Sequence, residues 1–357
     1  MARAAGPRSW AVLTALLVLA ALLYAPQLAT PWVYEDANWL GAITVAPSAW
    51  NVPSRDLTMQ TYHWTWQVAG LEPFAYRLGN FVLHLVNGTL IYATAAALIP
   101  GSAAVWAAGV FLLHPLNSEA ASYATARADL LMTFGTLLAI VVALWQPQRG
   151  TGHAIRWASL LTGLSIAALS KEIGLVAGPL VWVTLLLLRP DDWLTRWGLL
   201  LIGTIALAVV QPALSAIVFG IEPHNSGGSS LTWPMFMLLQ LTAAWHLLVL
   251  VAWPFGFSID HDVIGLAPAW TVFAGLATVQ AIALGLWAWR RAPLLAWGLA
   301  WGAVALAPRF LFRTNEFLHE YHLYVVVAGL SVPLGVGLSR LGAWRPPWPC
   351  VLQKVSV

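Results

Sequence analysis

Long apolar runs separated by short polar turns fill most of the chain. An α-helix needs roughly 20 apolar residues to cross a bilayer. About ten runs, several of them short, approach this length, and they cover residues 10–24, 78–99, 103–116, 130–145, 157–169, 173–188, 197–219, 270–289, 293–307 and 321–338. The pattern predicts an all-α fold, a polytopic integral membrane protein with about ten transmembrane helices.

The first apolar run, at residues 10–24, follows Arg3 and Arg8 and has the layout of a signal peptide. No small-residue cleavage site follows it cleanly, and many more apolar runs come later in the chain. We therefore expect an uncleaved first helix.

One apolar stretch, at residues 233–253, is ambiguous, and the positive-inside rule decides its placement. If it crossed the membrane, Arg290 and Arg291 would lie outside. If it lies in the interface or re-enters, the basic residues beside the other runs all face the cytoplasm; these are Arg3, Arg8, Arg149, Arg156, Arg189, Arg196, Arg290, Arg291, Arg340, Arg345 and Lys354. We therefore expect an interfacial or re-entrant segment, both termini inside, one domain over residues 1–345 and a cytoplasmic tail over 346–357.

Composition excludes an ordinary soluble protein. Hydrophobic residues make up 60% of the chain and charged residues 9%, with a mean hydropathy of +0.75, whereas about a quarter of residues are charged in soluble domains. The single cysteine, Cys350, excludes a disulfide framework and a cysteine metal site. The 17 basic residues are scattered, so the pI of about 9.2 reflects positive inner loops and not a surface for nucleic acid.

The acidic residues gather on one side of this topology. Asp191 and Asp192 lie inside, and the rest of the 14 Asp and Glu residues lie outside or at the outer membrane edge. The cations on that side are Arg55, Arg77, Arg127, Lys171, Arg309 and Arg313. A transporter places its key charges near the midplane, on broken helices of an internal repeat, and this sequence has no such repeat. A flippase or transporter of polyprenyl-linked sugars is the alternative to an enzyme.

The first outer loop, at residues 25–77, is too long for a simple connector and opens with "PWVYEDANW". Its Glu35 and Asp36 follow the first apolar run almost at once. A carboxylate partly removed from water takes the proton of a hydroxyl acceptor, and a neighbouring charge tunes its pKa. The two acids therefore suit base catalysis, and they equally suit a solvated loop or a helix cap.

The stretch "HPLNSEAASYATARADLL" places His114, Glu119, Arg127 and Asp129 between two apolar runs. Charged groups so close to hydrocarbon are expensive, which favours a functional role. A planar guanidinium meets phosphate oxygens with paired hydrogen bonds, so Arg127 is a candidate phosphate ligand. An ion pair between Arg127 and one of the two acids is the alternative.

Two later motifs add polar groups to the same face. "LSKEIG" places Lys171 and Glu172 where one run ends outside and the next begins, and such a pair also suits helix ends. "RTNEFLHEYHLY" places Glu320 between His319 and His322 at the last outer loop. No HExxH motif occurs, so these residues fit a metal site only loosely. We assign no cofactor, and a divalent metal stays possible.

The order of the motifs resembles a known family. "YED", "RDLTMQTYHW", "LEPFAYRLGNFVLHLVN", "HPLNSEAASYATARADLL", "LSKEIG" and a late "EYHLY" are similar to the membrane part of the transmembrane O-mannosyltransferases that carry tetratricopeptide repeats, and of their repeat-free bacterial relatives. These proteins are type-C glycosyltransferases. The resemblance covers residues from about 30 to 340, and its most specific motifs lie between Leu71 and Glu172.

The resemblance implies an enzyme that moves a sugar, mannose or another hexose, from a polyprenyl-phosphate carrier to an acceptor hydroxyl on the non-cytoplasmic face. It places the catalytic base on Asp36, with Glu35 beside it. The family usually has two aspartates there, so the choice between these two acids stays open. The family's other motif residues fall on Arg127, Lys171, His84, His114, Glu119, Asp129, Glu172 and Glu320. Tyr321 follows Glu320 where eukaryotic members have arginine.

The residues and the resemblance lead to one mechanism. Arg127 and Lys171 would stabilise the charge that grows on the departing phosphate. Asp36 would take the acceptor proton, and attack opposite the phosphate would invert the anomeric carbon. The expected partners are the polyprenyl-phosphate sugar, a protein, glycan or lipid acceptor, and membrane lipid. Richness in Ala, Leu and Trp favours a bacterial inner membrane, with the active site facing outward.

Overall fold

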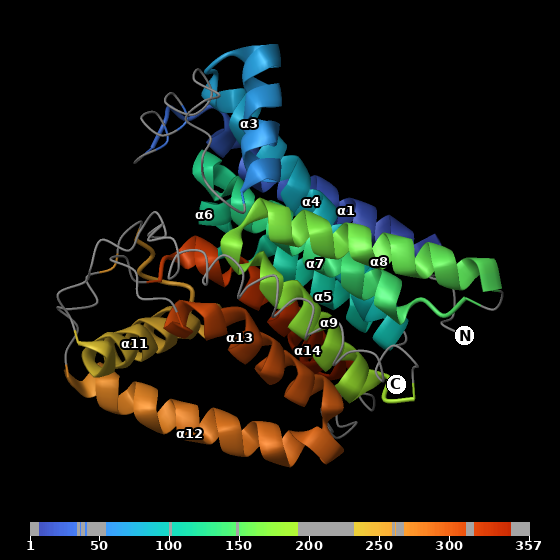
Figure 1. The fold of residues 1–357 in the computed structure, drawn as a ribbon, viewed down its shortest axis with the longest axis vertical. Coiled ribbons are helices and arrows are strands. Elements are labelled where there is room, and N and C mark those ends of the chain that lie inside the picture. The colour runs from blue at the N-terminus through green and yellow to red at the C-terminus, as the bar shows by residue number, and fades with distance from the viewer. Residues whose placement is uncertain are drawn as a thin grey trace, which may run out of the picture.

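The computed structural model describes residues 7–33, 36, 40, 55–99, 102–147, 150–191, 232–258, 261, 268–311 and 318–343. Every regular element in this part of the chain is a helix, which confirms the all-α prediction (Figure 1). The described elements are α1 (Pro7–Leu28), α3 (Asp56–Ala69), α4 (Pro73–Leu98), α5 (Ala103–Leu113), α6 (Asn117–Ser122), η2 (Ala124–Ala126), α7 (Arg127–Leu144), α8 (Gly150–Ser170), η3 (Glu172–Val176), α9 (Ala177–Leu188), α11 (Trp233–Ala252), α12 (Pro268–Arg291), α13 (Pro293–Leu311), η4 (Glu320–Leu323) and α14 (Tyr324–Ala343).

Six of the described helices are long and apolar enough to cross a membrane by length and composition. They correspond to α1, α4, η2 with α7, α11, α12 and η4 with α14, and two further apolar helices are shorter. The chain is therefore an all-α integral membrane protein. The count of about ten crossings stays a prediction, because the expected span at residues 197–219 lies outside the described residues.

The neighbouring helices α1 and α4 run antiparallel. The ring of Trp10, near the start of α1, lies 5.5 Å from the ring of Tyr92, near the end of α4. At the other end of the pair, Tyr24 of α1 stacks on Phe81 of α4 at 5.6 Å. Because α4 ends where α1 begins, one end of the bundle holds the end of α1 and the start of α4. This end was predicted to face outward and is called the outer end; the opposite end is called the inner end.

Glycines let α7 and α8 approach closely. A Cβ atom at Gly135 of α7 would lie 2.5 Å from the backbone nitrogen of Ala167 and 2.6 Å from the carbonyl oxygen of Gly163, both on α8. Close backbone approach through small residues is the usual means of packing helices in a membrane, where no hydrophobic effect drives them together. This contact matters for the site, because α7 begins with Arg127 and α8 leads directly into Lys171.

Two arginines cap helix ends at the inner end of the bundle. Arg156 donates hydrogen bonds to the carbonyl oxygens of Val142 and Ala143, in the last turn of α7. Arg189 donates to the carbonyl oxygen of Ala97, in the last turn of α4. Cations at helix C-termini satisfy free carbonyls and complement the helix dipole. These two residues were both predicted to face the cytoplasm.

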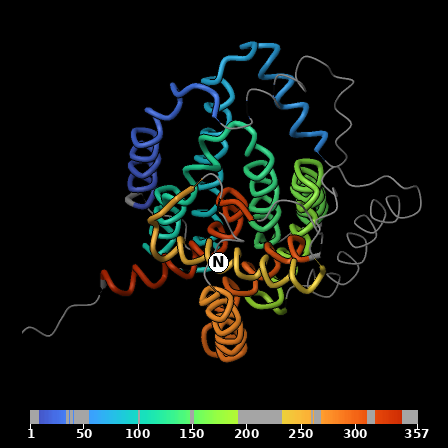
Figure 2. The backbone as a smooth tube through the Cα atoms, turned by 90° about the vertical axis from the view of Figure 1, so that its left-hand side faces the viewer, coloured from blue at the N-terminus to red at the C-terminus, as the bar shows by residue number. Residues whose placement is uncertain are grey.

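The orientation of α11 differs from that of the neighbouring α12. Figure 1 shows α12 lengthwise and α11 foreshortened, and Figure 2, turned by 90°, shows α11 lengthwise and α12 nearly end-on. The two helices thus cross, although α11 is long and apolar enough to span a bilayer. A helix lying across its neighbours suits the interfacial or re-entrant placement, which stays a prediction.

Candidate active site

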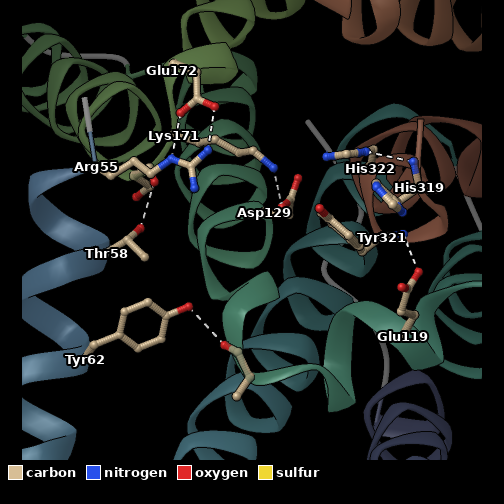
Figure 3. A network of polar contacts seen from close by, with 12 residues as sticks. Arg55, Thr58, Tyr62, Glu119, Asp129, Lys171, Glu172, His319, Tyr321 and His322 are labelled. Atoms are coloured by element: carbon tan, nitrogen blue, oxygen red, sulfur yellow. Dashed lines mark hydrogen bonds and ion pairs between the residues drawn. The ribbon is translucent and has the colours of Figure 1, made fainter. Parts of the chain in front are cut away.

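Polar side chains meet at the outer end of the bundle, between α3 and the short elements that join the long helices (Figure 3). The contributing segments are α3, α6, the start of α7, the turn between α8 and η3, and η4. These segments are far apart in the sequence. The fold therefore brings together most of the motifs that the sequence had marked.

Asp36 is fully buried, and its carboxylate accepts two backbone hydrogen bonds. One comes from Thr125 at 3.1 Å and a longer one from Ala124 at 3.4 Å, both in η2. Burial raises the pKa of Asp36 above the ordinary carboxyl value, although these two N–H groups and the charge of Arg77 act in the opposite direction. A carboxylate whose proton affinity has been raised in this way suits a general base.

Arg77 fixes the segment that carries Asp36. This fully buried side chain donates hydrogen bonds to the carbonyl oxygens of Thr30 and Pro31, just after α1, and to that of Ser122 at 2.9 Å, at the end of α6. It thereby ties the start of the first outer loop to the turn before η2. The placement of Asp36 against η2 therefore depends on an arginine of α4.

Lys171 lies in the interior of the outer end and forms an ion pair with Asp129. Its Nζ atom is 2.5 Å from Oδ2 of Asp129, and both side chains are almost completely buried. Burial lowers the pKa of Lys171 to about 8, with Asp129 opposing the shift. The ring of Tyr321 points toward this pair in Figure 3, and Nζ of Lys171 is 5.4 Å from its centroid.

Arg55 and Glu172 form a bidentate ion pair beside Lys171. Nε and Nη2 of Arg55 donate to the two carboxylate oxygens of Glu172 at 2.8 and 2.6 Å. One turn further along α3, Thr58 donates to the carbonyl oxygen of Ser170 at 2.7 Å. These contacts hold the start of α3 against the turn that carries Lys171.

Arg127 is buried, and neutral acceptors surround its guanidinium. Its nitrogen atoms donate at 2.9 to 3.2 Å to the side chains of Asn80 and Thr65 and to the carbonyl oxygens of Thr61 and Tyr76. The guanidinium also lies 4.6 Å from the centroid of the Tyr62 ring. Arg127 joins α3, α4 and α7, and neither of its predicted acidic partners contacts it in the described part of the chain.

Glu119 and Glu320 fix the loop around Tyr321. Glu119 accepts a hydrogen bond from the backbone N–H of Tyr321 at 2.9 Å. Glu320 accepts one from the backbone N–H of Ser258 at 2.8 Å and contacts Nε2 of His261 at 2.8 Å. Burial, together with the charge of Glu320, raises the pKa of Glu119 to about 8. The two acids thus connect α6 and η4 with the segment after α11.

His84 and His114 lie away from the ion pairs. His84 is buried in the middle of α4, where its ring nitrogens lie 3.0 Å from the Tyr324 hydroxyl and 3.1 Å from the carbonyl oxygen of Leu112. Nε2 of His114 hydrogen-bonds to the carbonyl oxygen of Val251, near the end of α11, at 2.9 Å. Both histidines connect helices and lie in the packing below the outer cluster.

Glu35, the other predicted catalytic acid, lies outside the described residues. Within the residues that the structure describes, no group of three or more His, Cys, Asp or Glu side chains has the arrangement of a metal site. The predictions on these two points stay predictions.

Sequence reasoning did not select several residues of this region. Arg55 and Tyr62 stand in the quoted motif "RDLTMQTYHW", Arg77 in "LEPFAYRLGNFVLHLVN", and His261 in no motif at all. The first three could have been selected from the sequence, because polar residues at helical spacing between apolar residues indicate a helix face that packs against protein. The pairing of His261 with Glu320 depends on the path of the chain after α11, for which the sequence gives no signal.

The junction of η2 and α7 holds both Asp36 and Lys171. Asp36 contacts Thr125, and Lys171 contacts Asp129, four residues later. The hydroxyl of Tyr62 donates a hydrogen bond to the carbonyl oxygen of Ala124 at 3.0 Å, in the same junction. A base and a cation that one junction holds can act on the same sugar phosphate.

Comparison with known proteins finds protein O-mannosyltransferases as relatives. The chain is 32% identical over 142 residues to protein O-mannosyl-transferase Tmtc1 of Drosophila melanogaster, 26% identical over 124 residues to TMTC3 of Homo sapiens, and 29% identical over 154 residues to Tmtc2 of Drosophila melanogaster. These matches cover 34%, 34% and 42% of this chain, and 16%, 13% and 16% of the relatives' own lengths. No protein-family model matches the chain, and no solved structure matches it significantly. Over about a third of its length the chain is similar to these protein O-mannosyltransferases.

Proposed function

We propose that the protein is a glycosyltransferase that moves a sugar, mannose or another hexose, from a polyprenyl-phosphate carrier to an acceptor hydroxyl on the non-cytoplasmic face. The similarity to O-mannosyltransferases supports sugar transfer as the reaction class. The observation that carries the proposal is that one junction, between η2 and α7, holds both the buried Asp36 and the buried Lys171 at the outer end of the bundle. A bacterial inner membrane, with this end facing outward, is the proposed location.

Asp36 is the proposed base. Its carboxylate takes the proton of the acceptor hydroxyl while that oxygen forms a bond to the anomeric carbon. The bond between the anomeric carbon and the phosphate oxygen breaks, and its electron pair stays on the phosphate. Attack from the side opposite the phosphate inverts the anomeric configuration. The raised pKa of the buried Asp36 favours this proton transfer.

Lys171 is the proposed ligand of the departing phosphate. Its ammonium is already fixed by Asp129, so no reorganisation is needed when charge develops on the leaving oxygen. Asp129 and Glu172 act as positioning residues, since the first holds Lys171 and the second holds Arg55 beside it. Glu119 and Glu320 position Tyr321 over the same cation.

Arg127 receives a different role from the one that its sequence context predicts. Four hydrogen bonds to neutral groups of the protein engage its guanidinium. Binding a phosphate directly would require Arg127 to give up contacts that hold α3 on α4. We therefore assign Arg127 to positioning α3 and to contributing positive potential, and leave the phosphate to Lys171.

Turnover of lipid-linked sugars by the purified protein in detergent tests the proposal. The donors are radiolabelled polyprenyl-phosphate monosaccharides, with a crude acceptor extract, and the matched negative donors are the corresponding polyprenyl diphosphate sugars. We expect release of polyprenyl phosphate and appearance of label in the acceptor, with inverted anomeric configuration. Binding of the donors without any transfer or hydrolysis, accompanied by their movement across vesicles, would instead support the transporter.

A further inference from the structure

Arg309 lies near the end of α13, one residue after Pro308. α13 packs against η3, the short helix that begins immediately after Lys171. The side chain is partly buried, and its Nε atom is completely buried. A third cation thus acts on Lys171, together with Arg55.

Arg309 differs from the other cations of this end because it has no partner in the described part of the chain. Its buried Nε has no hydrogen-bond acceptor, whereas Arg55 and Lys171 each contact a carboxylate. Arg127 also donates several hydrogen bonds. A buried donor left without an acceptor is costly, and more so when it carries a charge. Such a group is commonly retained where it binds a ligand.

His322 supplies a neutral donor beside these cations. Its Nδ1 accepts the backbone N–H of His319 at 3.0 Å, so the proton of the neutral ring is on Nε2. Figure 3 shows the other edge of the His322 ring turned toward Lys171 and Asp129. The charges of both Arg309 and Lys171 act on His322. Arg309 also acts on Lys171, so these three donors, from α13, η4 and the turn before η3, belong to one neighbourhood.

We propose that Arg309 is a further phosphate ligand, which binds the phosphate of the polyprenyl carrier together with Lys171, with the Nε2–H of His322 as a neutral donor. The inference rests on the proposed function and names a residue that neither the motifs nor the resemblance had selected. The observation that carries it is the buried Nε of Arg309, which has no acceptor among the described residues. A phosphate oxygen would supply the acceptor that the buried Nε lacks.

Thermal stability separates a ligand from a structural residue at this position. An arginine that held helices together would lose hydrogen bonds on substitution, and the protein would melt at a lower temperature. Removing a side chain whose buried Nε has no acceptor among the described residues costs the folded state no hydrogen bond at that atom. Arg309→Gln should therefore unfold near the wild-type temperature, while ligand binding falls.

Binding of undecaprenyl phosphate, followed by the fluorescence of the chain's 22 tryptophans, tests the inference. The uncharged polyprenol is the reference ligand, and Arg290→Gln, at an exposed position of α12 at the inner end, is the matched control. We expect Arg309→Gln to weaken the binding of the phosphate at least about tenfold, with no change for polyprenol, and Arg309→Lys to restore part of it. Wild-type affinity in Arg309→Gln, or weaker binding together with a lower melting temperature, would overturn the inference.

The wild type distinguishes failure of this inference from failure of the proposed function. If the wild type binds the lipid phosphate more tightly than polyprenol and Arg309→Gln does the same, the inference alone fails. If the wild type does not discriminate between the two lipids, the proposed function fails, and inorganic phosphate becomes the probe. Protection of the wild type by inorganic phosphate against thermal unfolding, absent in Arg309→Gln, would then retain Arg309 as an anion ligand.

Discussion

Lys171 shows at the residue scale how burial adjusts a charge to its task. Burial lowers its pKa to about 8, with Asp129 raising it and the charges of Arg309 and Arg55 lowering it further. Below about pH 8 the ammonium is present, and above it the charge is lost. We therefore expect the affinity for the polyprenyl-phosphate donor to fall as the pH rises through about 8, measured as the donor KM across a pH series.

Glu119 titrates in the same range, since burial and the charge of Glu320 raise its pKa to about 8. The variant Lys171→Arg distinguishes the titration of Lys171 from that of Glu119, because arginine keeps its charge well above pH 8. The fall in donor affinity should move to higher pH in Lys171→Arg. An unchanged profile in that variant would assign the titration to Glu119 and contradict the role of Lys171.

The sequence could predict which residues of the site carry charge but not which of them are free to bind. Lys171 and Asp129 stand in separate motifs, and the fold joins them at 2.5 Å. The sequence context of Arg127 predicted a phosphate ligand. In the structure, however, its guanidinium already donates hydrogen bonds to Asn80 and Thr65, which belong to two other helices. Arg309 was predicted only as one of six outer cations, because the lack of an acceptor for its Nε among the described residues depends on how the helices pack.

At the scale of the element, apolar runs predicted the long helices well and the short ones poorly. α4 begins at Pro73, before the predicted start at Leu78, because the added first turn includes the polar Arg77, whose side chain is buried against protein. The run predicted at residues 103–116 ends at Leu113, and a separate short helix, α6, follows. The turns of η2 and η3 have no periodic signature, although they position Asp36 and Lys171.

The contact between α7 and α8 gives a prediction at this scale. Gly135→Val would place side-chain atoms against the backbone of Ala167 and Gly163, so the two helices must separate. We expect a lower melting temperature together with loss of transfer activity, because Asp129 and Lys171 belong to these two segments. Gly275→Val on α12, where an added Cβ meets nothing within 4 Å, should leave both measurements near wild type. Equal effects of the two substitutions would contradict this account of the packing.

At the scale of the whole molecule, the two ends of the bundle have different chemistry. Arg156 and Arg189 cap helices at one end, and the ion pairs of Lys171 and Glu172 lie at the other. The positive-inside rule predicted basic residues at one end from loop charges. That this end faces the cytoplasm stays a prediction. The rule could not predict that inner arginines would act as helix caps, or that α11 would cross the direction of α12 (Figures 1 and 2).

The central claim is that Asp36 is the base of a sugar transfer at the outer end, and kcat for transfer from a polyprenyl-phosphate sugar by Asp36→Asn tests it most directly. Asp56→Asn is the matched control, since it changes an exposed aspartate at the start of α3. We predict a loss of about 10²- to 10⁴-fold in kcat for Asp36→Asn, with wild-type folding and donor affinity, and near wild-type turnover for Asp56→Asn. Full activity of a folded Asp36→Asn would contradict the claim.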